Sequence, residues 1–161
     1  MSERLRGGCA ALSMAAALLL LSGCAAVPAD PDGTLERVNE GDLRVGITHN
    51  PPWTEIRGTG SPSGHEVRLV QRFARSQGAD VRWTVASEAV LVDALSDGDL
   101  DLVIGGFIDD TPWTDKAAIT APFRESEVDG RVEKHVMLAP LGENRFLVTL
   151  EEFLHEQEAT P

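Results

Sequence analysis

Apolar and polar residues alternate in two segments of this chain, as they do along half-buried β-strands. In the first segment the alternating apolar residues are Leu43, Val45 and Ile47, and the Asn-Pro-Pro run at 50–52 ends it. In the second they are Val81, Trp83 and Val85. A third apolar segment, 102–104, is continuous, which is typical of a parallel strand covered on both faces. The pattern therefore predicts three strands.

Two amphipathic segments separate these strands. The first has one apolar helical face, formed by Val67, Val70, Phe73 and Ala74, and Gly78 lies where a C-terminal cap is expected. The second begins after Ser87, a suitable N-cap, and buries Val90, Leu91, Ala94 and Leu95. The βαβαβ order implies right-handed crossovers and an α/β fold, with a mostly parallel sheet and helices on both of its faces.

The last third of the chain has a weaker pattern. We expect a short strand near Ile119, a turn at Asp129-Gly130, a strand over 135–139 and an amphipathic helix over 143–157. The apolar face of that helix comprises Phe146, Leu147, Leu150, Phe153 and Leu154. Because this face would be aggregation-prone if exposed, residues 41–157 are predicted to fold as one unit with the helix packed on the sheet.

The first 40 residues have the composition of an export leader and a tether. A basic start, an apolar run over 10–21 and the ending Leu-Ser-Gly-Cys predict a lipoprotein signal peptide over 1–23, with Cys24 as the lipidated first residue of the mature chain. A plain secretory signal is the alternative, and the run is too short for a transmembrane helix. Residues 24–40, rich in Ala, Pro, Asp and Gly, are expected to form a flexible tether.

Charge and cysteine content narrow the classes of function. The formal net charge is −12, and loss of the leader would make it one unit more negative. Such a chain does not suit nucleic acid or electrostatic binding to anionic lipid; solubility is its simplest meaning, and attraction of a cationic solute is the sharper one. Cys9 leaves with the leader, so no disulfide is expected within the mature chain.

Three phrases resemble the first lobe of the family 3 extracellular solute-binding proteins, the periplasmic receptors of amino-acid ABC transporters. They are Gly-Asp-Leu-Arg-Val-Gly-Ile at 41–47, Gly-His-Glu-Val-Arg-Leu-Val at 64–70, and Ala-Leu-Ser-Asp-Gly-Asp-Leu-Asp-Leu-Val-Ile-Gly-Gly at 94–106. The resemblance implies one three-layer lobe of a type II periplasmic-binding-protein fold. About a dozen residues after Phe123 the chain resumes with what resembles the family's closing strand and helix, so the second lobe is expected to be missing.

Ligands of open α/β sheets bind beyond the carboxyl ends of the strands. The candidate binding residues there are Trp53, Gly106, Asp109, Asp110, Thr111 and Trp113. Trp53 matches the family's ligand-covering aromatic, or it packs on loop prolines; Asp109 and Asp110 contact solute, or one caps a short helix beginning near Thr111. The Arg that pairs with an amino acid's carboxylate in the family is replaced by Trp113 or Thr114, which favours a cationic or neutral solute.

Enzyme signatures are weak. The four histidines share no metal-ligand spacing, the Gly105-Gly106 pair lacks a nucleotide-loop continuation, and no serine stands in a nucleophile elbow, so no metal, cofactor or catalytic residue is expected. We expect an exported, lipid-anchored binding module that binds solute weakly or completes its site against an ABC permease or other membrane protein. A structural or interaction lipoprotein without ligand is the alternative, and a domain associated with a peptidoglycan-cleaving enzyme is a third.

Overall fold

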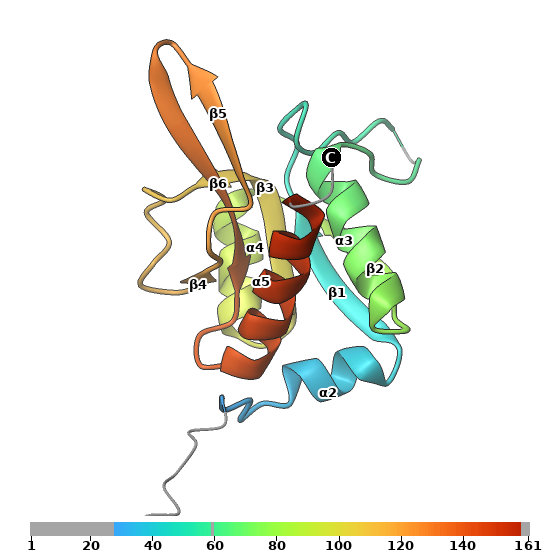
Figure 1. Cartoon of the computed structure of the whole chain (residues 1–161). Coiled ribbons are helices and arrows are strands. Elements are labelled where there is room, and N and C mark those ends of the chain that lie inside the picture. Colours follow the sequence, from blue (N-terminus) through green and yellow to red (C-terminus); the bar gives the residue numbers. More distant parts are fainter. Residues whose placement is uncertain (1–27, 59, 159–161) are drawn as a thin grey trace, which may run out of the picture.

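A mixed six-stranded sheet forms the centre of the molecule (Figure 1). The computed structural model describes residues 28–58 and 60–158. The strands are β1 (Asp42–Ile47), β2 (Asp80–Val85), β3 (Leu102–Ile108), β4 (Ala118–Ile119), β5 (Arg124–Val128) and β6 (Arg131–Ala139). Their order is β2-β1-β3-β6-β4, and β5 pairs with β6 outside this path.

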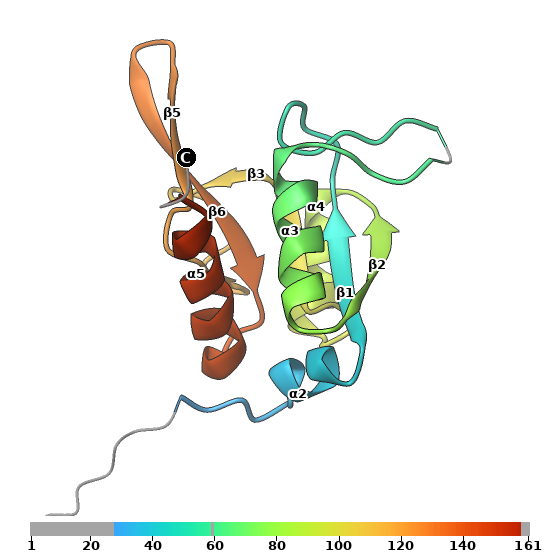
Figure 2. The same ribbon diagram turned by 45° about the vertical axis from the view of Figure 1, so that its right-hand side comes forward.

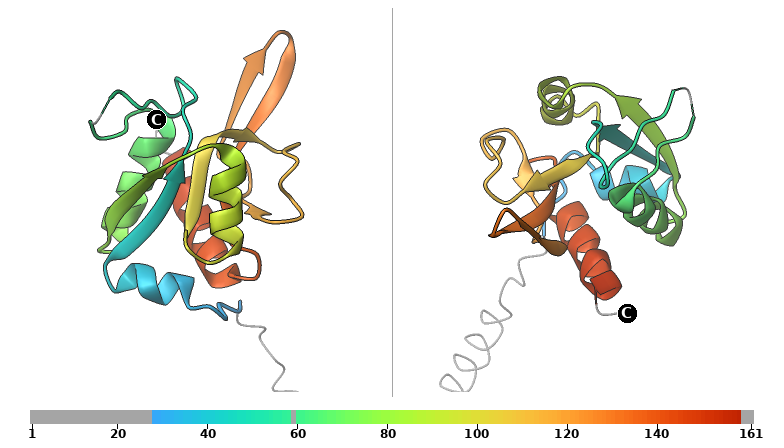
Figure 3. Two further views of the ribbon diagram at one scale, coloured as in Figure 1. Left: turned by 180° about the vertical axis from the view of Figure 1, so that it is seen from behind. Right: turned by 90° about the horizontal axis from the view of Figure 1, so that it is seen from above.

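The helices cover both faces of the sheet. They are α2 (Thr34–Asn39), α3 (His65–Ser76), α4 (Glu88–Ser96) and α5 (Asn144–Glu158). Seen from behind, α4 lies in front of the sheet, on the face opposite α3 and α5 (Figure 3). The core is divided accordingly: Leu102 and Ile104 pack with the α3 and α5 side chains, whereas Val103 between them packs with those of α4. The expected three-layer α/β lobe is therefore confirmed.

The predicted βαβαβ unit is present, and only part of the sheet is parallel. Strand β1 pairs in parallel with β2 and β3, whereas β6 runs antiparallel to β3, β4 and β5. The description "mostly parallel" thus holds for the first three strands alone. Strand β3 also continues four residues beyond the predicted 102–104, because Gly105 and Gly106 extend it without contributing to an apolar pattern.

Strands β5 and β6 form a hairpin that projects from the body of the molecule (Figure 2). The turn is the predicted Asp129-Gly130, and both residues have positive φ, 50° and 74°, as a two-residue hairpin loop requires. The hairpin begins directly after Phe123, where the family resemblance implies the start of a second lobe. Two turn residues connect the strands at this point instead.

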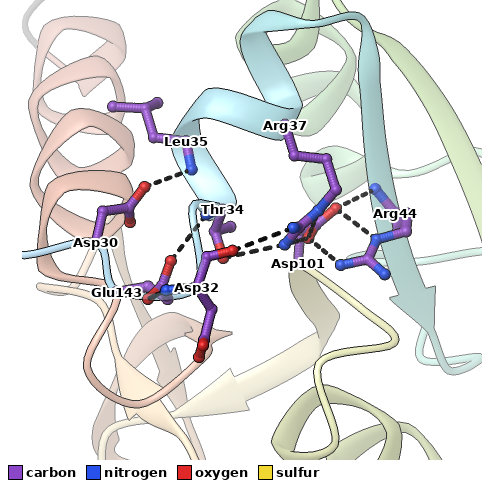
Figure 4. Close-up of polar contacts among 8 residues, drawn as sticks. All are labelled: Asp30, Asp32, Thr34, Leu35, Arg37, Arg44, Asp101 and Glu143. Atoms are coloured by element: carbon purple, nitrogen blue, oxygen red, sulfur yellow. Dashed lines mark hydrogen bonds and ion pairs between the residues drawn. The ribbon is translucent and has the colours of Figure 1, made fainter.

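The expected tether over 24–40 is wrong for its last part, because residues 34–39 form α2. Leu35 and Val38 are buried in the main core, and the first turn of α2 is held by carboxylates (Figure 4). Glu143 accepts hydrogen bonds from the backbone N–H groups of Asp32 (2.9 Å) and Thr34 (2.8 Å), and Asp30 accepts one from Leu35 (2.8 Å). These bonds satisfy donors that a helix N-terminus leaves free.

The two carboxyls near α2 affect each other's ionisation. Burial raises the pKa of Asp30, and the adjacent Glu143 raises it further. Burial also acts to raise the pKa of Glu143, but the hydrogen bonds from Asp32 and Thr34 outweigh it, so that pKa lies below its ordinary value. The two pKa values therefore shift in opposite directions, and of the two carboxyls Glu143 is the one whose charged form is favoured by its surroundings.

A buried aspartate ties the same end of the sheet together. Asp101 has no exposed side-chain surface and accepts hydrogen bonds from Arg37 (3.0 Å) and Arg44 (2.6 Å), as well as from the Arg44 backbone N–H (Figure 4). It thereby links β3 to α2 and β1.

Candidate functional site

The carboxyl ends of β1 and β3 bring two loops to one edge of the sheet. The strands are parallel, with Ile47 opposite Ile104, and the Thr48 N–H continues the pairing by donating to the Ile104 carbonyl (3.2 Å). The loop after β1 and the loop after β3 therefore leave the sheet together, as expected for a ligand site in an open α/β fold.

The loop after β1 is fixed by its own polar groups. Thr54, which is fully buried, donates from Oγ1 to the Thr48 carbonyl (2.6 Å) and accepts from the Asn50 N–H (3.0 Å). The Asn50 side-chain amide donates to the Gly105 carbonyl (2.8 Å). These bonds attach the loop to the end of β3 and hold Trp53 in place.

Trp53 lies directly against the backbone of Gly106. A Cβ added at Gly106 would be 2.8 Å from Trp53 Cδ1 and 2.5 Å from Asn50 Nδ2, and the residue has φ of 69°. Both the close approach and the positive φ require glycine here. Two of the predicted site residues, Trp53 and Gly106, are thus brought into contact at the strand ends.

Trp53 also belongs to an aromatic cluster that extends away from the strand end. Its ring lies over that of His135, with centroids 3.6 Å apart and an interplanar angle of 32°. It also meets the rings of His65 and Phe123 edge to face, with ring centroids 5.8 Å and 6.5 Å from its own. Half-buried Trp53 therefore joins the loop after β1 to α3 and to the base of the hairpin. The sequence analysis expected it to cover a ligand or to pack on loop prolines, and it did not predict this aromatic packing.

His135 was not predicted as a site residue, and it is almost completely buried, with 1% of its surface exposed. Its Nε2 lies 2.7 Å from Ser126 Oγ across the hairpin, while Nδ1 has no hydrogen-bond partner among the described residues. Burial lowers the pKa of His135. The neutral ring is the form that stacks on Trp53 near neutral pH.

Glu66 is a second residue that the sequence analysis did not assign to the site. Its carboxylate Oε2 accepts hydrogen bonds from the backbone N–H groups of Gly105 (2.9 Å) and Gly106 (3.0 Å), and the side chain is fully buried. Oε1 is buried and has no hydrogen-bond partner among the described residues. Burial raises the pKa of Glu66 from 4.5 to about 7. Through these hydrogen bonds Glu66 holds the Gly106 backbone, against which Trp53 packs.

Trp113, the second tryptophan among the predicted site residues, lies in the loop after β3 and packs in a different part of the core from Trp53. Trp113 packs with the α4 side of the core, and its indole N–H donates to Glu88 (3.4 Å), whereas Trp53 packs on the α3 and α5 side. The two tryptophans therefore do not form a pair. The short helix expected from Thr111 is also wrong, since residues 112–116 form turns.

The acidic residues of this loop are accessible. Asp109 and Asp110 are exposed, and the Asp109 N–H donates to the Lys134 carbonyl (3.0 Å), which fixes the start of the loop on β6. Thr111 is buried, and its hydroxyl has no hydrogen-bond partner among the described residues. Both aspartates are thus open to solvent.

Metal and membrane signatures are not found in the part of the chain that the structure describes. Within residues 28–58 and 60–158, no group of His, Cys, Asp and Glu is arranged to hold a metal ion, and no helix of this part is long and apolar enough to cross a bilayer. The leader and Cys24 lie outside the described residues.

Known structures share this lobe. The arginine-bound form of domain 1 from TmArgBP superposes with a TM-score of 0.67 at 21% identity, covering 75% of this chain and 97% of that one. An ancestral cationic amino acid solute-binding protein has a TM-score of 0.69 at 13% identity, covering 78% and 94%. Both likenesses establish the fold.

Sequence comparison gives the family. Over 65 residues the chain is 43% identical to membrane-bound lytic murein transglycosylase F of Pseudomonas fluorescens (strain Pf0-1), a match that covers 40% of this chain and 12% of that protein. Residues 43–156 match the family model of the bacterial extracellular solute-binding proteins, family 3. Because that match spans well over half of the chain, the protein belongs to the bacterial extracellular solute-binding proteins, family 3.

Proposed function

We propose that this chain is a single-lobed solute-binding protein that binds a cationic or neutral polar solute weakly, at the ends of β1 and β3. The observation that carries the proposal is the contact between Trp53 and the Gly106 backbone, which fixes a half-buried indole at the strand ends, where ligands of this fold class bind. An aromatic face attracts cations such as ammonium and guanidinium groups.

Charge supports the same class of solute. Asp109 and Asp110 are exposed in the loop after β3, and the whole chain has a formal net charge of −12. In the same loop either Trp113 or Thr114, depending on the register of the comparison, replaces the Arg with which the family binds a carboxylate. An acidic amino acid would meet like charge and would lack a bidentate partner.

The names of similar structures agree with this choice. One is an arginine-bound form of domain 1 alone, and another is an ancestral cationic amino acid solute-binding protein. One lobe of this fold thus holds arginine as domain 1 alone. Its 21% identity to this chain establishes only that the two share a fold.

Weak binding is part of the proposal. Small-molecule sites usually bury about 70–90% of their ligand, whereas one lobe leaves a face of the solute in water. Loss of that contact would remove several kcal/mol, or on the order of a thousandfold in affinity, so we expect dissociation constants in the millimolar range. A membrane protein such as an ABC permease could cover the exposed face and complete the site.

Export and anchoring complete the proposal. The family is extracellular, and the Leu-Ser-Gly-Cys ending of the leader supports lipid attachment at Cys24 on a bacterial membrane.

A protein-interaction role without solute is the second candidate. It is supported by the projecting β5–β6 hairpin, whose tip residues Val128 and Val132 are 45% and 63% exposed.

Calorimetry with variants of the acidic loop tests the proposed solute class. Arginine should bind the full chain in the millimolar range, and Asp109→Asn combined with Asp110→Asn should weaken it by about tenfold or more, since each lost charge contact contributes roughly 1 kcal/mol. Asp115→Asn, an exposed carboxyl of the same loop, is the matched control. Absence of any amino-acid binding would favour the interaction role.

A further inference from the structure

A small cavity lies between the beginning of α3 and the end of α5. Its volume is about 190 Å³. The two helices pack side by side on one face of the sheet, so that the last turn of α5 lies beside the first turns of α3 (Figure 1). The polar side chains that line the cavity are His65, Arg72, Arg124 and Gln157.

Three elements bring these side chains together. His65, Leu69 and Arg72 are spaced i, i+4 and i+7 on α3, so they share one helical face. Arg124 begins β5, and Gln157 lies in the last turn of α5. Of these residues His65 also touches the strand-end site, because its ring meets that of Trp53 edge to face with centroids 5.8 Å apart.

The floor of the cavity is apolar. It consists of Leu69, Phe123 and Leu154, which are 4%, 3% and 3% exposed. A bound molecule would therefore meet hydrocarbon on one side and cationic or amide groups on the other. That combination suits an amphiphilic organic molecule better than a hydrated inorganic ion.

The local charge is positive, although the chain as a whole is acidic. Burial lowers the pKa of His65, and the positive charges of Arg124, Arg68 and Arg72 lower it further. Three guanidinium groups, two of which line the cavity, thus act on the His65 imidazole. In a chain with a formal net charge of −12, such a concentration of positive charge is the reverse of the average surface.

We propose that this cavity binds a small organic carboxylate. The guanidinium groups of Arg72 and Arg124 are the side chains best suited to pair with a carboxylate, because their planar N–H groups match its two oxygens. The Gln157 amide and the His65 ring supply further donors, and the apolar floor receives the hydrocarbon part of the acid. A volume of about 190 Å³ is below the roughly 300–1,000 Å³ of drug-sized sites, so the ligand is small.

The proposal goes beyond the strand-end function, since the two sites prefer opposite charges and use different residues. Benzoate is a suitable probe of the cavity, with neutral benzamide as its isosteric control and inorganic phosphate as a test for simple charge attraction. We expect NMR titration of the full chain to give saturable shifts with benzoate and to show that benzoate raises the pKa of His65. Benzamide and phosphate should bind at least tenfold more weakly.

Variants on the two arginines decide the assignment. Arg72→Gln and Arg124→Gln should each weaken benzoate binding by about tenfold, as loss of a charge-assisted hydrogen bond does. Both side chains are exposed, so the fold should be retained. Arg75→Gln, on the same helix but lining a different surface hollow, is the matched control and should bind benzoate as the parent does. The proposal is overturned if benzoate fails to saturate, if benzamide or phosphate binds equally well, or if Arg75→Gln has the same effect as Arg72→Gln.

Discussion

Removing the charge of Glu66 should change how the stability of this protein depends on pH. In the folded chain, burial raises the pKa of Glu66 from 4.5 to about 7. Between these two values the folded state holds a proton that the unfolded state has released, so the free energy of unfolding falls as pH rises. One pH unit of displacement corresponds to about 1.4 kcal/mol, so the loss between pH 4.5 and pH 8 is roughly 3 kcal/mol.

The Glu66→Gln variant separates this effect from every other titration. Glutamine keeps a carbonyl oxygen that can accept from the Gly105 and Gly106 N–H groups but does not ionise. Urea unfolding of the parent and the variant should be measured at steps from pH 4.5 to pH 8. The difference between their unfolding free energies should shift by roughly 3 kcal/mol in favour of the variant as pH rises.

Two comparisons make the experiment decisive. Glu152→Gln removes an exposed carboxyl of α5 and should give a curve nearly parallel to that of the parent. Glu66→Ala, which leaves both glycine N–H groups without their acceptor, should cost about 2–5 kcal/mol at pH 5. If the parent and Glu66→Gln curves run parallel over the whole range, Glu66 is not a buried titrating group and the reasoning fails.

Three further predictions concern the fold and the leader. Leu150 is fully buried on α5, so Leu150→Asp should cost several kcal/mol in a thermal melt, whereas Val148→Asp, on the exposed side of the helix, should cost less than about 1 kcal/mol; equal melting temperatures would refute docking of α5. Asp101→Asn should cost roughly 3 kcal/mol in urea unfolding, because its two arginine partners lose a buried charge, and an equal loss in the exposed neighbour Asp99→Asn would contradict this. Cys24→Ser should abolish incorporation of labelled acyl chains, and unchanged labelling would disprove the proposed anchor.

Regular elements were predictable where burial alone determines the pattern. Leu43, Val45 and Ile47 are completely buried, and their alternation directly records the two faces of β1. The apolar face of α3 was found in the same way. The N-terminal helix α2 was missed because it has only six residues and is held by Glu143, which follows Thr34 by 109 positions. No local pattern carries that information.

The positions of the candidate site residues were predictable in part, for reasons that differ between residues. Trp53 and Gly106 lie together at the strand ends as expected, because strand ends can be located from the sequence. Trp113 was grouped with Trp53 among the candidate residues but packs in the other core cluster. The side of the sheet on which a loop residue packs depends on turns, which have no periodicity to read. Glu66 had a signal that could have been used: it lies four and seven residues before Val70 and Phe73, so a carboxyl occurs on the apolar face of α3.

The most direct test of the central claim is NMR detection of the three tryptophan indole N–H groups and the Gly106 amide while arginine is added to the full chain. The account predicts saturable shifts of the Trp53 indole and the Gly106 amide, with a dissociation constant in the millimolar range, and little change at Trp83 on β2. Glutamate should leave these signals unchanged. Micromolar binding of glutamate, or arginine-dependent shifts confined to Trp83, would contradict a weak cation-binding site at the ends of β1 and β3.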